Sequence, residues 1–522
     1  MTAVNPRTTS STPAVRLGKP SNEGRTSRND AHRDLLEPDA VKVACPVLRG
    51  PGLSNGLGLP DQLSHTGLSL SAAFDEPNLV SAAGLVPVMS LARKAGLGDL
   101  AQKRLSVPTD KGANAGRKVS SLVAGMVAGA DSIDDMAILR HGGMGRLFKA
   151  CYAPSTLGSF LRSFTFGHVR QVDGVASRFL TNLAARTPLL ASTEGYTLVD
   201  VDDTIIEVHG YKKQGSSYGY SGIRGLNALL ATVSTKDTAP VILAQRLRRG
   251  SAGSPRGAAR LVADALATLK RIRGTHTTSP VLLRADSAFY GYATVAAAAK
   301  AGADVSITAR MNPAIRRAIA SIDGNGWKPI QYTDAVFDEA SDRWISSAEV
   351  AETPFTAFSS RKRTERVIGR LIVRRIPDLN PHAGAGQPTI FDTYRFHAFF
   401  TTGALDVVAA DKTHRGHAVI EQVNADLKDS ALAHMPSGVF TANAAWLVLA
   451  AMAFNLTRAA ATAAGNGLAK ARTGTIRRKL ISVPARIASS ARKLRLHLPE
   501  DWPWETAWTD LLNHILPRPA KT

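Results

Sequence analysis

The chain has 522 residues, enough for two to four domains, and its 44% hydrophobic and 20% charged residues are typical of globular domains. Lys and Arg number 64 against 42 Asp and Glu, and the formal net charge of +22 indicates a polyanionic partner such as nucleic acid. The two cysteines, Cys45 and Cys151, exclude a disulfide framework and a cysteine-based zinc site, which fits the cytoplasm, and no apolar run reaches the ~18 residues of a membrane span.

Two compositionally different segments precede the first strand pattern. Residues 1–65 are rich in Ser, Thr, Pro, Gly and Arg without a sustained period, so we expect a disordered basic tail. Residues 66–190 follow a helical period and contain many Arg and Lys residues. Short helices joined by tight turns suit a helical DNA-binding region of the helix-turn-helix kind, and a plain helical bundle would give the same pattern.

Residues 191–312 change to a pattern of strands and helices. The predicted strands span residues 197–210, 226–235, 240–250, 279–287 and 304–310, and the predicted helices span 257–273 and 291–302. The resulting order β-β-β-α-β-α-β is that of an RNase H-like core, with three antiparallel strands followed by helical crossovers to parallel strands. The sequence therefore predicts an α/β fold with a mixed sheet.

The remaining residues continue this core and end in a basic segment. Residues 313–403 contain several strand-like stretches, which predict a β-rich insertion. Helices resume over residues 404–465, which we assign to the second part of the core. Residues 466–522 form a basic C-terminal region, in which residues 475–488 and 491–498 are expected to pair as a basic β-hairpin.

Several acidic residues are candidates for a metal site. Asp200 and Asp202 share one face of the first core strand, and Asp203 points to the other face. Two carboxylates on one face among apolar neighbours favour a divalent cation, because buried charges need a partner. Asp286 ends the fourth strand, which lies beside the first in an RNase H-like core. With Glu421 on a later helix, these acids would form an oxygen-only site for Mg²⁺ or Mn²⁺, and two such ions about 3.5–4 Å apart can clamp a phosphodiester.

The segment HRGHAVIEQVNADLK, residues 414–428, is predicted to form one helix. Glu421 and Lys428 are seven residues apart, so their side chains lie within about 20° of each other around the helix axis. Arg415 and His417 lie at the helix N-terminus, where the helix dipole favours anions. We therefore expect Arg415, His417 and Lys428 to contact DNA phosphates, although a helical surface with solvated charges is the simpler alternative.

Four of these stretches resemble one known family. LVDVDDTIIEVHG, LLRADSAFYG, HRGHAVIEQVNADLK and RLHLPEDWPW are similar to the DDE transposases of bacterial insertion sequences, in particular the IS-four-like superfamily with a β-strand insertion and its IS-thirteen-eighty group. The resemblance spans residues 75–510. It implies the catalytic and metal-binding triad Asp202, Asp286 and Glu421, with Asp200 and Asp203 as possible additional acids.

The resemblance also implies an activity and partners. Such a transposase binds the terminal inverted repeats of its element and performs Mg²⁺-dependent cleavage and strand transfer with two ions. Its partners would be double-stranded DNA and a second copy of the chain, without a membrane, in the bacterial cytoplasm at the nucleoid. The superfamily signature Tyr-x2-Arg-x3-Glu-x6-Lys is matched at Glu421 and Lys428, whereas His414 and His417 occupy its Tyr and Arg positions and Arg415 is displaced.

Three alternative functions are compatible with parts of the sequence. The first is an RNase H-like DNA nuclease without strand transfer, and the second is a non-catalytic DNA-binding derivative. The third is a phosphatase related to haloacid dehalogenases, because DVDDT fits the motif Asp-x-Asp-x-Thr. In that class Asp200 would be the nucleophile and Asp202 the acid or base.

Overall fold

The computed structural model describes residues 71–516, except 109, 150, 191–194, 211, 275–278, 339–342, 378–393, 466 and 491–492. The tail predicted over residues 1–65, including Cys45, lies outside the described residues. Residues from Phe74 onward belong to one compact unit, and the domain boundaries inferred from sequence remain predictions.

The centre of the molecule is a mixed sheet built from β2 (Thr197–Glu207), β4 (Arg224–Ser234), β5 (Val241–Arg249), β6 (Val281–Ala285) and β7 (Asp304–Thr308). Their order is β5-β4-β2-β6-β7. The first three strands along the chain pair antiparallel, and β6 and β7 join β2 in parallel. This is the RNase H-like order, so the predicted α/β fold with a mixed sheet is confirmed.

Helices cover the central sheet on both faces. The crossover helices α7 (Ala258–Arg273) and α8 (Tyr292–Lys300) pack against each other, and α7 also packs on β4 and β5. Helix α11 (Val419–Lys428) packs on β2. Every residue of β4 after Arg224 is buried, which explains why this strand is apolar without alternation.

The strands of the predicted insertion continue the same sheet. They are β8 (Lys328–Asp338), β9 (Arg343–Ala357), β10 (Val367–Pro377) and β11 (Tyr394–Thr401). Strand β11 pairs antiparallel with β7, and β10, β9 and β8 follow in order, so the sheet has ten strands when the short β3 (Ser217–Tyr218) is included. Helix α9 (Pro313–Ala320) precedes these strands, and α10 (Val407–Arg415) packs on β9 and β10.

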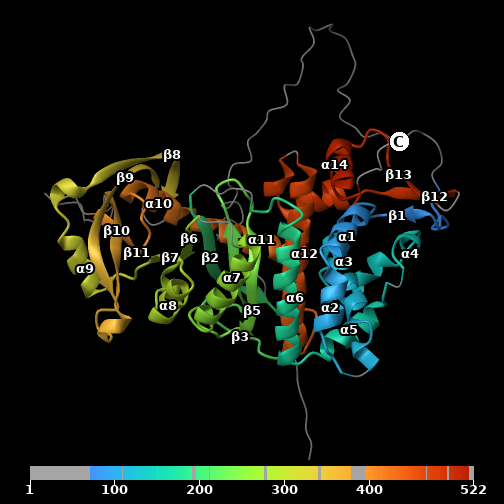
Figure 1. Ribbon diagram of the computed structural model, residues 1–522, viewed down its shortest axis with the longest axis horizontal. Coiled ribbons are helices and arrows are strands. Elements are labelled where there is room, and N and C mark those ends of the chain that lie inside the picture. Colours follow the sequence, from blue (N-terminus) through green and yellow to red (C-terminus); the bar gives the residue numbers. More distant parts are fainter. Residues whose placement is uncertain are drawn as a thin grey trace, which may run out of the picture. The chain divides into compact units, whose positions relative to one another are not determined.

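The region before the core is helical, as the sequence predicted. Its helices are α1 (Leu85–Lys94), α2 (Leu97–Arg104), α3 (Ala115–Ala128), α4 (Met144–Leu147), α5 (Pro154–Arg162) and α6 (Phe166–Ala184). The later helix α12 (Phe440–Ala464) contacts α1, α3, α5 and α6 as well as β5, and it runs beside α6 (Figure 1). Among the described helices, α12 alone is long and apolar enough to cross a membrane, but 89% of its most apolar window is buried inside the protein.

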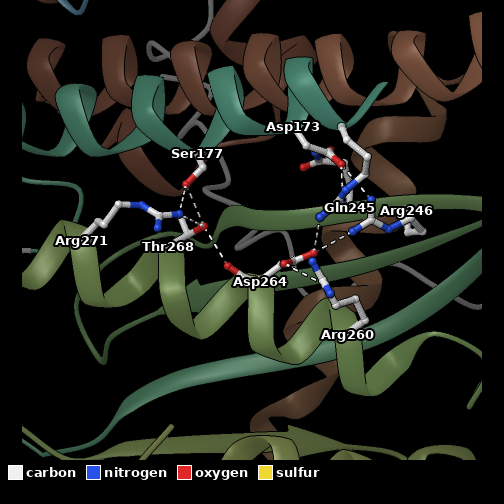
Figure 2. A network of polar contacts seen from close by, with 9 residues as sticks. Asp173, Ser177, Gln245, Arg246, Arg260, Asp264, Thr268 and Arg271 are labelled. Atoms are coloured by element: carbon white, nitrogen blue, oxygen red, sulfur yellow. Dashed lines mark hydrogen bonds and ion pairs between the residues drawn. The ribbon is translucent and has the colours of Figure 1, made fainter. Parts of the chain in front are cut away.

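A polar network fastens α6 to the core sheet and to α7 (Figure 2). Arg246 on β5 lies 2.7 Å from Asp173 on α6 and 2.8 Å from Asp264 on α7. Gln245 donates a second hydrogen bond to Asp173. The hydroxyl groups of Ser177 on α6 and Thr268 on α7 form a hydrogen bond of 2.9 Å. Burial raises the pKa of Asp173, and the charge of Arg246 opposes this rise. One arginine therefore joins the helical region to two elements of the core.

The basic C-terminal region contains the predicted hairpin over part of its length. Strands β12 (Ala485–Ser490) and β13 (Lys493–His497) pair antiparallel, and β1 (Leu79–Val80) adds to β12. The register pairs Arg486 with His497, so Arg486, Lys493 and Arg495 share one exposed face of the hairpin.

The part of this prediction that covers residues 475–481 is wrong. This segment is helical, formed by α13 (Thr473–Ile476) and a π-helical turn over Arg477–Ile481. Ile476 and Leu480 are four residues apart and both are buried, which is helical spacing. Helix α14 (Glu505–Ile515) then packs on α12 and α1.

Candidate active site

Two of the three aspartates on β2 are paired with arginines. Asp200 is fully buried, and Arg284 on β6 donates from Nε and Nη2 to its two carboxylate oxygens at 2.7 and 2.8 Å. Asp203 points to the other face of the strand, where Arg248 Nη2 lies 2.8 Å away and Asn227 also donates to it. The negative charges of Asp200 and Asp203 are therefore compensated within the fold.

Asp202 has a different environment. Its carboxylate accepts a hydrogen bond of 2.8 Å from Asn424 Nδ2 on α11, and within the described part of the chain it makes no ion pair. Burial raises the pKa of Asp202 from 3.8 to about 6. A backbone hydrogen bond at Asp203 and the charge of His417 oppose this rise, and the charges of Asp203 and Asp286 add to it. Asp202 is thus a half-buried acid that, unlike Asp200 and Asp203, is not paired with an arginine among the described residues.

Asp286 lies next to Asp202 at the end of the neighbouring strand. The parallel register of β2 and β6 pairs Asp200 with Arg284 and Val201 with Ala285, so the next position along each chain brings Asp202 beside Asp286. Asp286 is exposed and accepts a hydrogen bond of 2.9 Å from the backbone N–H of Ala288, which fixes the turn after β6. The structure thus brings together two of the three acids of the predicted triad.

Helix α11 presents one face to these acids. Glu421, Asn424 and Lys428 are spaced by three and four residues and lie on that face. Burial lowers the pKa of Lys428, and the charge of Asp202 opposes this effect, so Lys428 is close enough to interact with that carboxylate. Glu421 is exposed, and among the described residues no three acids, histidines or cysteines are grouped as a metal site. The structure therefore does not bring the Glu421 carboxylate to Asp202 and Asp286.

The prediction of one continuous helix over residues 414–428 is wrong. Helix α10 ends at Arg415, and a 3₁₀ turn over Gly416–Ala418 separates it from α11. The cause is Arg284, which donates to the carbonyl of Thr413. In a continuous helix this carbonyl would accept the N–H of residue 417. A side chain at position 416 would also come within 2.9 Å of the Arg284 guanidinium.

The basic residues of this segment contact other residues of the protein. His417 Nδ1 lies 3.0 Å from Asp200, and Arg415 Nε lies 2.8 Å from Asp411 within α10. His414 stacks on Phe399, with ring centroids 4.0 Å apart. Burial lowers the pKa of His414 to about 3, so its imidazole is neutral. Lys428 thus faces Asp202, whereas His414 is part of the packing between α10 and the sheet.

Sequence reasoning missed three residues that organise this site. Arg284 is a charged residue inside the apolar strand Val281–Ala285, and this contrast could have identified it as the partner of a buried acid. Asn424 lies one helical turn after Glu421, so the helical period already placed it on the same face. Arg248 gave no such signal, because the polar segment QRLRRG is typical of a strand end.

The polar groups around Asp202 fit a hard divalent cation. The side-chain oxygen of Asn424 is buried without a hydrogen-bond partner among the described residues, although the amide nitrogen binds Asp202. A cation here would accept this oxygen as a ligand and would compensate the charges of Asp202 and Asp286. Carboxylate and amide oxygens are the ligands that Mg²⁺ and Mn²⁺ prefer.

Comparisons with known proteins identify the family of the chain. The family model described as "Transposase DDE domain group 1" matches residues 64–520. A cryo-EM structure of the piggyBac transposase synaptic complex with hairpin DNA resembles the chain at 10% identity and a TM-score of 0.34, covering 83% of this chain and 80% of that one. No curated protein matches the sequence. Because the family model covers most of its length, the chain belongs to the DDE transposase domain family, group 1.

Proposed function

We propose that this transposase binds the terminal inverted repeats of an insertion sequence, cleaves the DNA at their ends with Mg²⁺ or Mn²⁺, and joins the released ends to target DNA. The observation that carries this proposal is the position of Asp202, within β2, beside Asp286, which directly follows the adjacent strand β6, with no arginine to compensate Asp202. In an RNase H-like sheet these two positions suit the ligands of a phosphodiester-cleaving site.

The site residues have separate roles in this proposal. Asp202, Asp286 and Glu421 hold the ions, and the oxygen of Asn424 is a further candidate ligand. Glu421 lies one turn before Asn424 on the same face of α11, so a movement of this helix or of the Glu421 side chain toward Asp202 would complete the triad. When bound, a pair of such ions lowers the pKa of the attacking water or 3′-hydroxyl and neutralises the leaving oxygen.

The protein's own charges orient the DNA strand. Lys428 faces Asp202 and can bind the phosphate next to the one that is cleaved. The buried pair of Asp200 and Arg284 keeps β2 and β6 in register, which keeps Asp202 and Asp286 adjacent. Arg415 and His417, both proposed as phosphate contacts, would have to exchange Asp411 and Asp200 for DNA.

The wider proposal concerns partners and origin. The net charge of +22 supports binding to double-stranded DNA. Two transposon ends must be held together for strand transfer, so we propose a homodimer in the DNA complex. The motif resemblance supports membership of the IS-four-like superfamily and its IS-thirteen-eighty group, an origin in bacteria, and a place at the nucleoid in the cytoplasm.

The alternative functions are less well supported by the geometry. A phosphatase of the haloacid dehalogenase type needs Asp200 as an accessible nucleophile, but Asp200 is fully buried and both its oxygens bind Arg284. A non-catalytic DNA-binding protein would have no use for an unpaired Asp202 beside Asp286. A nuclease without strand transfer uses the same site, and only the products of the reaction distinguish it from a transposase.

The experiment is an assay with a DNA duplex that ends in the inverted repeat of the element. We expect the purified protein with Mg²⁺ to cut this duplex at the repeat boundary and to join the cut end to a target plasmid. Cleavage without any joined product would favour the nuclease. Hydrolysis of small phosphoesters that is lost in Asp200→Asn would favour the phosphatase.

A further inference from the structure

A cavity lies behind α11, on the side of this helix that faces away from the candidate active site. Its volume is about 610 Å³, within the range of about 300–1,000 Å³ usual for small-ligand sites. Val419, Gln422, Val423 and Asp426 of α11 line it, and they are spaced by three, one and three residues. Around a helix they lie about 180° from the face with Asn424. Helix α11 therefore separates this cavity from Asp202 and Asp286.

Four exposed cations surround the cavity, and we call them the cationic rim: Lys236, Lys412, Lys470 and Arg472. They come from the turn between β4 and β5, from α10 and from the segment after α12. None of the four makes an ion pair within the part of the chain that the structure describes. Four cations from three segments thus converge without acidic partners, which favours an anionic ligand.

The single acid that lines the cavity does not compensate this charge. Asp426 is buried and accepts hydrogen bonds from Arg458, from the backbone N–H of Thr473 and from the Thr473 hydroxyl. Arg458 also lines the cavity and is only 5% exposed, and its Nε has no hydrogen-bond partner among the described residues. A buried donor without a partner is costly, and a ligand atom that accepts from it would remove this cost.

The remaining wall is mostly apolar, although Ser234, Thr235 and Thr238 also line it. Leu198 at the start of β2, Ala239 and Pro240 before β5, and Val419 and Val423 contribute aliphatic surface. A small inorganic anion would leave this surface and most of the volume unused. A ligand with both a flat, weakly polar ring and a phosphate matches the wall and the cationic rim together.

We propose that this cavity binds a nucleotide, with its phosphate at the cationic rim and its base against the apolar wall. The nucleotide is either a free molecule or one unit of a DNA strand, because both have the phosphate and the base that the cavity would bind. Arg284 also lines the cavity and binds Asp200 on its other side, so the site adjoins the active-site sheet without sharing Asp202 or Asp286. Binding therefore does not depend on the proposed catalytic function.

The test is a pair of titrations with the full-length protein, one with fluorescent mant-dATP and one with a fluorescein-labelled single-stranded 10-mer. The variants are the double substitution Lys412→Ala with Lys470→Ala, which removes half of the rim, and Val419→Trp, which fills the cavity from a half-buried position. We expect each variant to weaken binding of at least one probe by about tenfold or more, since a lost charge-assisted contact has about this effect.

Matched controls separate the cavity from general attraction to a basic protein. Lys270→Ala with Lys300→Ala removes two exposed lysines on α7 and α8 that do not line the cavity, and it should leave both affinities within twofold of the wild type. Asp202→Asn should leave the affinity for mant-dATP within twofold of the wild type, even if it abolishes DNA cleavage. Weakened mant-dATP binding supports a free nucleotide, and weakening of the 10-mer alone supports a DNA strand. Unchanged affinity for both probes in the two cavity variants overturns the proposal.

Discussion

Replacing Arg284 by Met would test whether the buried pair with Asp200 holds the two core strands together. The exposed fractions of the two side chains are 2% and 0%, and their hydrogen bonds measure 2.7 and 2.8 Å. Removing Arg284 leaves the buried Asp200 with His417, 3.0 Å away, as its remaining partner among the described residues, and losing one member of a buried ion pair costs about 3–5 kcal/mol. We expect the free energy of unfolding to fall by this amount, and the urea midpoint to fall by roughly 1 M, with an unchanged m-value.

The matched control for this variant is Arg260→Met on α7. The Arg260 side chain is 75% exposed and lies 3.3 Å from Asp264, and exposed ion pairs contribute only about 0–1 kcal/mol. The double variant Asp200→Leu with Arg284→Met should regain most of the lost stability, because it removes the unpaired charge. Equal urea midpoints for Arg284→Met and Arg260→Met, or a double variant no more stable than Arg284→Met, would refute this reasoning.

Three further predictions follow from the same contacts. Because burial raises the pKa of Asp202 to about 6, the folded protein keeps a proton that the unfolded chain releases, so the stability should fall by up to about 3 kcal/mol as the pH rises from about 4 to about 6. In thermal unfolding across this pH range, the stability of Asp202→Asn should change less with pH than that of the wild type. An equal change in both proteins would argue against the raised pKa. Changing Arg486, Lys493 and Arg495 to Ala should weaken DNA binding and reduce the slope of log affinity against log salt by about 2–3, whereas an unchanged slope would exclude this hairpin face as a DNA contact. Arg246→Met should lower the free energy of unfolding by about 1–3 kcal/mol in urea titrations, because two carboxylates lose a shared cation, and no loss would mean that the network does not fasten α6 to the core.

The sequence predicts the core sheet well because each strand has a recognisable local pattern, and because the order of the elements along the chain fits the order of the strands in the sheet. The β-branched stretch around Asp202 and the apolar strand before Asp286 have strand character on their own. The rules for short connections and crossovers then leave few arrangements, and the RNase H-like order is one of them. The neighbouring positions of Asp202 and Asp286 follow from this order alone.

The features that the sequence did not predict depend on contacts between distant segments. The break at Gly416 arises because Arg284, which lies 132 residues earlier (416 − 284), takes the Thr413 carbonyl. The pairing of β11 with β7 turns the predicted insertion into a continuation of the sheet, and no local pattern specifies such edge pairing. The helix over Thr473–Ile481 replaces a predicted strand because Ile476 and Leu480 are buried on one face of a helix.

The most direct test of the central claim is the position of manganese in crystals of the protein grown with Mn²⁺, measured by anomalous X-ray scattering. We expect manganese between the carboxylates of Asp202 and Asp286, with metal–oxygen distances of about 2.0–2.6 Å, and with Glu421 of α11 turned toward the same ions. Manganese bound only elsewhere, or none between these two carboxylates at saturating Mn²⁺, would contradict the assignment of this site.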